Sequence, residues 1–200
     1  MNESMLDFQQ IYTTFKPKIL GYLSRLAGQE EAEDLCQETF LKVEKGLSEF
    51  RGEAQLSTWV YRIASHVFHD HLRSRSFKQQ HCEQPPDLDD NLLEDRAPLS
   101  QEPKPQVDQQ VIRAEMNSCI RGYIDQLPER YREVLLLSEE EGFKNREIAE
   151  ILQISIDNVK VRLHRARAQL KETLQDHCDF YLDERSEIAC DRKQPDDSNT

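Results

Sequence analysis

The chain is 200 residues long, with 32% charged and 37% hydrophobic residues and a formal net charge of −12. This length suits one or two domains with cores of their own, and the acidic balance argues against nucleic-acid binding over the whole surface. Because we find no signal peptide and no apolar run of about 18 residues, we expect a cytoplasmic chain without membrane insertion. The five cysteines are scattered, which predicts reduced thiols rather than a disulfide framework.

The charge is unevenly distributed along the chain. Residues 144–171 hold seven Lys and Arg against three acids, a net charge of +4. Residues 83–108 hold two basic against eight acidic residues, and residues 172–200 hold three against nine, so each stretch has a net charge of −6. Because affinity for the phosphate backbone rises with the number of cations presented, the isolated chain should bind free DNA weakly and depend on a larger partner.

The first 80 residues contain three amphipathic helical patterns. The first covers residues 5–27, where Pro17 predicts a kink or a break and Gly28 predicts the end of the helix. The second covers residues 30–45 and opens with acids, which suit the positive end of a helix dipole. The third begins near Ser57, after a loop interrupted by glycines, and is cationic outside its apolar face.

The second half begins with a change of composition. Residues 81–109 combine prolines with acids and lack an apolar period, which predicts a disordered acidic linker. Helical patterns resume over residues 107–125 and again from Leu127-Pro128, where proline suits a first helical turn. The tail after residue 174 is acidic and shows little sign of a core.

Residues 144–171 predict a helix-turn-helix, with a basic second helix of the kind that enters a major groove. Ser155 suits the N-cap of that helix. Gln153 lies where such turns often carry glycine, so we expect a positive φ there. The apolar positions of the second helix recur every three or four residues and are expected to be buried. They are Ile156, Val159, Leu163, Ala166 and Leu170.

These patterns together predict an all-α fold with two small helical domains at residues 1–80 and 110–174, a linker at 81–109 and a tail at 175–200. Two other classes of protein stay open. A conventional repressor or activator would use the helix-turn-helix alone on duplex DNA. A metal-dependent helical hydrolase would use the cluster HVFHDH, although one helix supplies at most a partial ligand set. The residues of that cluster are His66, His69, Asp70 and His71.

Four segments, together with their order and spacing, resemble the extracytoplasmic-function sigma factors, the minimal sigma subunits of bacterial RNA polymerase. They are AEDLCQETFLKV (32–43), FRGEAQLSTWVYRIAS (50–65), LPERYREVLLLSEEEGF (127–143) and NREIAEIL…NVKVRLHRARAQL (145–170). The resemblance implies a three-helix domain like sigma region 2 and a four-helix domain like region 4. It implies promoter recognition and transcription initiation without catalytic activity or a cofactor. The implied partners are the RNA polymerase core enzyme, promoter DNA and an anti-sigma factor.

The resemblance also implies roles for individual residues. The −35 element would be contacted by Lys144, Arg146, Asn158, Lys160, Val161, Arg162, His164, Arg165 and Arg167. The −10 element would be contacted by Phe50, Arg51, Gly52, Trp59, Arg62, His66, Arg73 and Arg75. The polymerase would be contacted by Asp34, Gln37, Glu38, Phe40 and Leu41.

The tail adds three residues whose placement is loosely similar to the cysteine-bearing extensions of some metal-responsive relatives. They are His177, Cys178 and Cys190. Thiolates and imidazoles suit copper or zinc, but the spacing is not a CxxC signature, so no metal site is assigned firmly. A metal- or redox-responsive sigma factor therefore stays an alternative, beside an ordinary tail or a docking segment for an anti-sigma protein.

Overall fold

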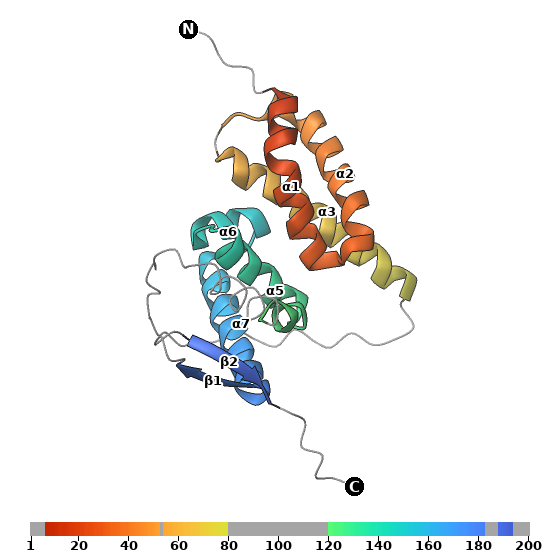
Figure 1. Cartoon of the computed structure of the whole chain (residues 1–200). Coiled ribbons are helices and arrows are strands. Elements are labelled where there is room, and N and C mark those ends of the chain that lie inside the picture. Colours follow the sequence, from red (N-terminus) through yellow and green to blue (C-terminus); the bar gives the residue numbers. More distant parts are fainter. Residues whose placement is uncertain (1–6, 53, 80–119, 183–187, 194–200) are drawn as a thin grey trace.

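The computed structural model describes residues 7–52, 54–79, 120–182 and 188–193, and Figure 1 shows their helices in two groups that lie against each other. The predicted linker at 81–109 lies outside these residues, as does the predicted helix before residue 120. The all-α prediction is confirmed for both groups. The first group contains α1 (Phe8–Ala27), α2 (Gln29–Gly46), the 3-10 turn η1 (Leu47–Glu49) and α3 (Leu56–Gln79). The second contains helical residues 120–125, α5 (Glu129–Leu135), the π-helical turn η2 (Leu136–Glu140), α6 (Asn145–Leu152) and α7 (Ile156–His177).

Capping residues set the ends of α1. The side chain of Asp7 accepts a hydrogen bond from the Gln9 N–H at 3.1 Å and so begins the helix. The helix then runs through Pro17 as one element, so the predicted break does not occur. It ends at Gly28, as predicted, because φ is +90° there and α2 starts directly afterwards. This short connection brings α1 and α2 side by side.

The first group packs the apolar stripes of its three helices together. Ile19 and Leu23 from α1, Val43 from α2 and Val60 and Phe68 from α3 are almost completely buried. These side chains recur at the helical spacing seen in the sequence, and they leave one face of α2 toward solvent, whereas α3 also contacts the second group of helices.

The helix-turn-helix of the second group has the predicted turn. The Ser155 hydroxyl accepts the Asn158 N–H at 3.1 Å and caps α7. Gln153 adopts φ 55° and ψ 42°, the left-handed conformation, and ends α6. Val159, Leu163 and Ala166 are buried as predicted.

The expected burial of Ile156 is wrong, because this side chain is 42% exposed. Ile156 is the first residue of α7, directly after its N-cap Ser155 at the turn. The apolar stripe of α7 therefore begins at Val159.

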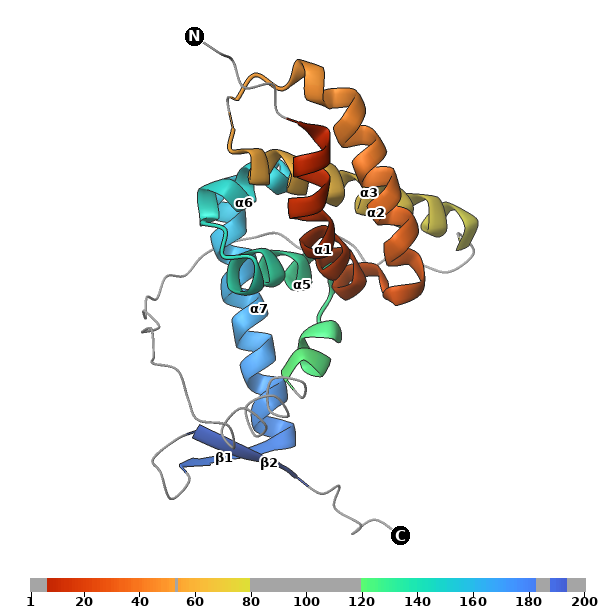
Figure 2. The same ribbon diagram turned by 45° about the horizontal axis from the view of Figure 1, so that its top comes forward.

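The tail contains a hairpin that we had not predicted. Strands β1 (Cys178–Leu182) and β2 (Ile188–Arg192) pair antiparallel, with Phe180 opposite Cys190. The hairpin directly follows α7 and lies at the far end of that helix from α6 (Figure 2). Phe180 and Tyr181 are exposed, so the strands add little to the core.

None of the helices in the described ranges combines the length and the apolar character needed to cross a bilayer.

The left-handed turn gives a test of the fold. A side chain in this conformation costs free energy that glycine does not pay, so Gln153→Gly should raise the free energy of unfolding by up to about 1 kcal/mol. Gln169, an exposed residue within α7, is the matched control, and Gln169→Gly should lower stability by about 0.5–1 kcal/mol. Urea unfolding of the full chain measures both, and a loss of stability in both variants would contradict the turn geometry.

Candidate nucleic-acid interface

The basic face of α7 is the strongest candidate site. Lys160, His164 and Arg167 are exposed, and Arg162 and Arg165 are half-buried on the same helix. The remaining predicted residues of this helix, Asn158 and Val161, are also half-buried. The face is thus available, in part, to a ligand that approaches α7 from solvent.

Several cations of this face are held by short ion pairs and hydrogen bonds. Lys160 Nζ lies 3.1 Å from an Asp157 carboxylate oxygen, and Arg162 Nε donates to Asn158 Oδ1 at 2.9 Å. Arg167 lies 2.6 Å from Glu139. Because Asp157 and Glu139 are exposed, the ion pairs of Lys160 and Arg167 contribute little stability and can be exchanged for contacts with phosphate oxygens.

The N-terminus of α6 carries the other two predicted cations of this region. Lys144 and Arg146 are exposed, and the Lys144 N–H donates to the Glu147 carboxylate at 2.8 Å. Both side chains extend the basic surface. They lie at the N-terminus of α6, and because the positive end of a helix favours anions, this position suits a phosphate group.

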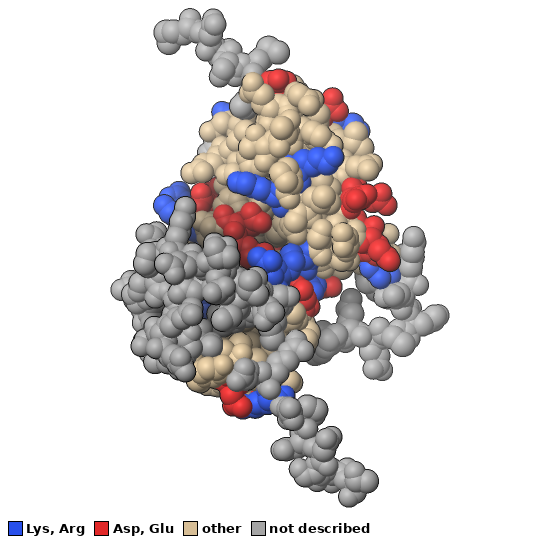
Figure 3. Space-filling view, viewed as in Figure 1, with Lys and Arg blue, Asp and Glu red and all other residues tan. Residues whose placement is uncertain are grey.

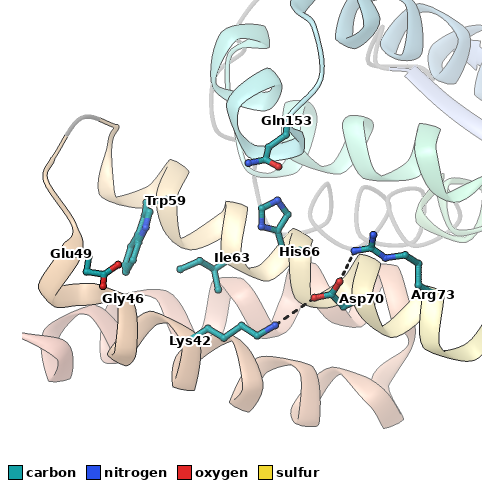
Figure 4. A pocket seen from close by; sticks show the side chains of 9 residues that line it. All are labelled: Lys42, Gly46, Glu49, Trp59, Ile63, His66, Asp70, Arg73 and Gln153. Atoms are coloured by element: carbon teal, nitrogen blue, oxygen red, sulfur yellow. Dashed lines mark hydrogen bonds and ion pairs between the residues drawn. The ribbon is translucent and has the colours of Figure 1, made fainter.

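An aromatic cavity lies between η1 and α3. The rings of Phe50 and Trp59 are 4.9 Å apart, and a Cβ on Gly46 would approach the Trp59 ring to 3.2 Å. The neighbouring loop residues Arg51 and Gly52 are exposed, with φ +72° at Gly52. The cavity has a volume of about 630 Å³, and Figure 4 shows its walls. They are Lys42, Gly46, Glu49, Trp59, Ile63, His66, Asp70, Arg73 and Gln153.

The predicted cations of α3 do not form one continuous surface. Arg62 Nε donates to the Glu150 carbonyl of α6 at 2.9 Å, so it faces the second group of helices. Arg75 forms an ion pair with Glu31 of α2 at 2.6 Å. Arg73 pairs with Asp70 at the cavity, beside His66. The structure thus brings Trp59, His66 and Arg73 together but turns Arg62 and Arg75 elsewhere.

The exposed face of α2 combines acidic and apolar side chains. Asp34, Gln37, Glu38 and Leu41 are exposed, and the exposed fraction of Leu41 is 55%. The structure does not place Phe40 with them. Phe40 is 3% exposed and packs edge-on against Tyr12 at 4.9 Å, so it supports this face from the core.

The histidines and cysteines singled out in the sequence do not converge. His69 Nε2 lies 2.9 Å from Glu133, and His71 Nε2 lies 2.7 Å from Glu31, on different helices. His177 Nδ1 lies 2.9 Å from the Thr173 carbonyl. Among the residues that the structure describes, no group of three or more His, Cys, Asp or Glu side chains could hold a metal ion. The metal-dependent hydrolase therefore has no site in this part of the chain.

The cysteines differ in exposure. Cys36 is buried, and its burial raises the pKa of the thiol. Cys178 is buried and Cys190 is half-buried, and the strand register places both on the same face of the hairpin. Cys119 lies outside the described residues.

Sequence reasoning missed Lys42, Glu49 and Gln153 as walls of the cavity. Lys42 follows Glu38 by four residues, and the two form an ion pair at 3.0 Å, which reads in the sequence as an ordinary helical pair. Gln153 joins the cavity only because α6 packs on α3, which no local pattern predicts.

Comparison with known families matches both groups of helices. Residues 11–78 match the model for Sigma-70 region 2, and residues 117–170 match the model for Sigma-70, region 4.

Curated relatives are similar over most of their length. The chain is 34% identical to RNA polymerase sigma factor YlaC of Bacillus subtilis, over 84% of this chain and 92% of that protein. It is 32% identical to the RNA polymerase sigma-H factor of Pseudomonas aeruginosa, over 84% and 86%. It is also 32% identical to ECF RNA polymerase sigma factor SigW of Bacillus subtilis, over 84% and 89%.

Solved structures share the fold. The sigma factor RpoE of Bartonella quintana, in complex with the anti-sigma factor NepR, is 24% identical with a TM-score of 0.62, over 84% of this chain and 97% of that one. CnrH, in complex with the cytosolic domain of CnrY, is 20% identical with a TM-score of 0.56, over 84% and 88%. With two sigma-70 regions in order and relatives matched nearly end to end, the chain belongs to the extracytoplasmic-function sigma factors of the sigma-70 family, which direct RNA polymerase to promoters.

Proposed function

We propose that α7 of this sigma factor reads the −35 element in the major groove. The observation that carries the proposal is the solvent-accessible basic face of α7. This helix is the second of the helix-turn-helix, after α6, and Ser155 is its N-cap. Its proposed contacts with bases and backbone are Lys160, Val161, Arg162, His164 and Arg165, together with Asn158. Lys144, Arg146 and Arg167 are better suited to phosphate contacts, which position the protein without specifying sequence.

The cavity beside α3 is proposed to receive a base of the −10 element. Opening a promoter requires an unstacked base to be held away from its neighbours, and an aromatic wall supplies a stacking surface for it. Trp59 provides that wall, with the Phe50 ring packed against it at 4.9 Å, and His66 and Arg73 also line the cavity. Arg51, Gly52, Arg62 and Arg75 would then contact the adjoining backbone after rearrangement.

The face formed by Asp34, Gln37, Glu38 and Leu41 is proposed to dock on the polymerase. An acidic face with a protruding leucine suits a basic amphipathic helix, because charge steers the encounter and the apolar residue is buried on contact. Phe40 is proposed to hold this face in shape rather than to touch the partner.

The regions are proposed to comprise residues 1–80 and 110–174, joined by residues 81–109 and followed by a tail at 175–200. The protein would act in the cytoplasm by binding alone, without a catalytic step of its own or a cofactor. An anti-sigma factor is proposed to control it, because the sigma factor RpoE, which has a similar fold, was solved in complex with the anti-sigma factor NepR.

Replacing a basic residue that is proposed to contact the −35 element should impair DNA recognition and leave polymerase binding intact. Arg165→Ala should weaken recognition of the −35 element by about 1–3 kcal/mol and reduce promoter-dependent run-off transcription accordingly. Polymerase binding in a pull-down should stay unchanged. The control is Lys171→Ala, an exposed cation further along α7. Equal transcription by Arg165→Ala and wild type, on promoters enriched by the holoenzyme, would contradict the proposal.

Reversing a charge on α2 should prevent docking. Asp34→Lys places a cation against a basic partner, so affinity for core polymerase should fall by about a hundredfold or more. Glu172→Lys makes the same charge change on an exposed part of α7 and should leave affinity unaltered. Co-purification with core enzyme measures both, and normal recovery of Asp34→Lys would remove this face from the interface.

A further inference from the structure

Exposed aliphatic side chains need a different explanation from exposed charges in this protein. Where the two groups of helices meet, acidic and basic side chains lie beside one another (Figure 3), as Arg25 does at 2.9 Å from Asp125 and 2.7 Å from Glu140. An aliphatic side chain cannot form such pairs. In the part of the chain that the structure describes, the large aliphatic side chains that are exposed are Leu41 of α2 and Ile156 of α7.

Ile156 is the one that lies on the helix-turn-helix. It is the first residue of α7 and is 42% exposed, whereas Val159 and Leu163 of the same helix are 0% and 3% exposed. The Ser155 hydroxyl fixes this end of the helix by accepting the Asn158 N–H at 3.1 Å. A single exposed isoleucine is ordinary on a protein surface, and what distinguishes Ile156 is its place at the start of α7.

The start of the second helix is the part of a helix-turn-helix that lies nearest to the bases. Its N-terminal residues contact base edges in the major groove, while the first helix crosses the sugar-phosphate backbone. The helices α6 and α7 follow each other in this order, and the proposed phosphate contacts Lys144 and Arg146 lie at the start of α6. In the proposed binding mode, Ile156 therefore lies at the end of α7 that enters the groove.

The first turn of α7 is unsuited to a phosphate group. The side chain of Ile156 has no hydrogen-bond donor, and the next side chain, the carboxylate of Asp157, is 88% exposed. A carboxylate repels phosphate, whereas at a base edge it can accept a hydrogen bond from cytosine N4. This turn therefore fits base edges better than the backbone.

One feature of the base edges suits an aliphatic side chain. Adenine, guanine and cytosine present only hydrogen-bonding groups in the major groove, whereas thymine also presents an apolar C5-methyl group. If Ile156 covered a hydrogen-bonding group, it would displace water from that group without replacing the lost hydrogen bond, which is unfavourable. Contact with the methyl group instead removes apolar area of both partners from water.

We propose that Ile156 contacts a thymine methyl group in the −35 element and thereby sets a preference for thymine at one position. This inference rests on the proposed reading of the −35 element by α7. It adds an apolar, base-specific contact to the basic contacts of the same helix.

Removing the methyl group from the DNA tests this contact with the protein unchanged. Deoxyuridine differs from thymidine only by the missing methyl group, so each thymine of the −35 element, on either strand, is replaced singly. The binding of holoenzyme, assembled from the full chain and core polymerase, is then measured on duplex promoters that it enriches. Affinity should fall about fourfold at one thymine, as expected for one methyl-sized group that is no longer buried. Unchanged affinity at every thymine would overturn the proposal.

Truncating Ile156 should remove this sensitivity. Ile156→Ala should bind the thymine promoter about fourfold more weakly than wild type does, for the same reason. It should also bind the thymine and uracil promoters equally, because the two changes remove the same contact and their effects do not add. Ile156→Val keeps a branched apolar side chain and should keep the preference for thymine. If Ile156→Ala still discriminates against uracil by the wild-type factor, the contact is not made by Ile156.

Two matched variants separate this contact from general effects. Val161→Ala shortens another aliphatic side chain of α7, which lies five residues away on a different side of the helix, and it should keep the sensitivity to uracil. Loss of that sensitivity in Val161→Ala and not in Ile156→Ala would assign the methyl contact to Val161. Phe180→Ala removes an exposed side chain of the hairpin and should bind all promoters as wild type does. Equal weakening by Ile156→Ala and Phe180→Ala would also overturn the proposal.

A methyl group on another base gives an independent check. At the sensitive position, a cytosine in place of thymine carries no methyl group, and 5-methylcytosine restores one at the same ring carbon. Wild-type holoenzyme should bind the methylated promoter about fourfold more tightly than the unmethylated one, whereas Ile156→Ala should bind both equally. Equal binding of the two forms by wild type would contradict a methyl contact.

Replacing the whole −35 element distinguishes failure of this contact from failure of the proposed function. If an unrelated −35 sequence leaves the binding of wild-type holoenzyme unchanged, the proposed reading by α7 fails and the methyl contact fails with it. If the unrelated sequence weakens binding but uracil does not at any position, the contact of Ile156 alone fails.

Discussion

The burial of one carboxylate organises the contact between the two regions. Glu133 has three region 2 partners, on α1 and α3, and without them its buried carboxyl group would stand unpaired at the junction. The requirement fixes position as well as proximity, because hydroxyl and imidazole donors must meet the two carboxylate oxygens together. The Arg25 ion pairs and the Tyr61–Phe143 ring contact join the same two regions.

Charge distribution explains how an acidic protein can act on DNA. The net charge of −12 is concentrated in the stretches at 83–108 and 172–200, whereas α7, the helix proposed to read the −35 element, lies in a segment of net charge +4. Weak contacts at two elements, joined on one chain and carried by a polymerase, reach a combined strength that neither has alone. We expect the acidic stretches also to limit binding of the free protein to other DNA, since like charges repel the phosphate backbone.

Local patterns predicted the elements of the fold well because each helix carries its own signals. Ser155 and Gly28 mark ends through capping and through φ, and Gln153 was expected in the left-handed region from its place in the turn. Ile156 and Phe40 show the limits of the same reasoning. Periodicity indicates which face of a helix is apolar, but the packing of neighbouring elements decides which side chains are shielded from solvent. Ile156 is therefore exposed and Phe40 is buried.

The contact between the regions could not be predicted in this way. Tyr22 and Glu133 are 111 residues apart in sequence, and Glu133 reads as one more acid in a charged helix. Only the partner positions on α1 and α3 give it a distinct environment. The candidate residues on α7 were accessible to sequence reasoning because they share one helix, whereas the cavity needs η1, α3 and the turn after α6 together.

The junction combines polar and apolar contacts. Its polar partners are carboxylates, hydroxyls, an imidazole and guanidiniums, which water solvates well. Beside them, the rings of Tyr61 and Phe143 meet across the two regions, and the buried apolar side chains of both regions belong to one continuous cluster. The apolar part stabilises the contact because it removes apolar area from water. The polar pairs set its register, since each donor must meet a particular oxygen.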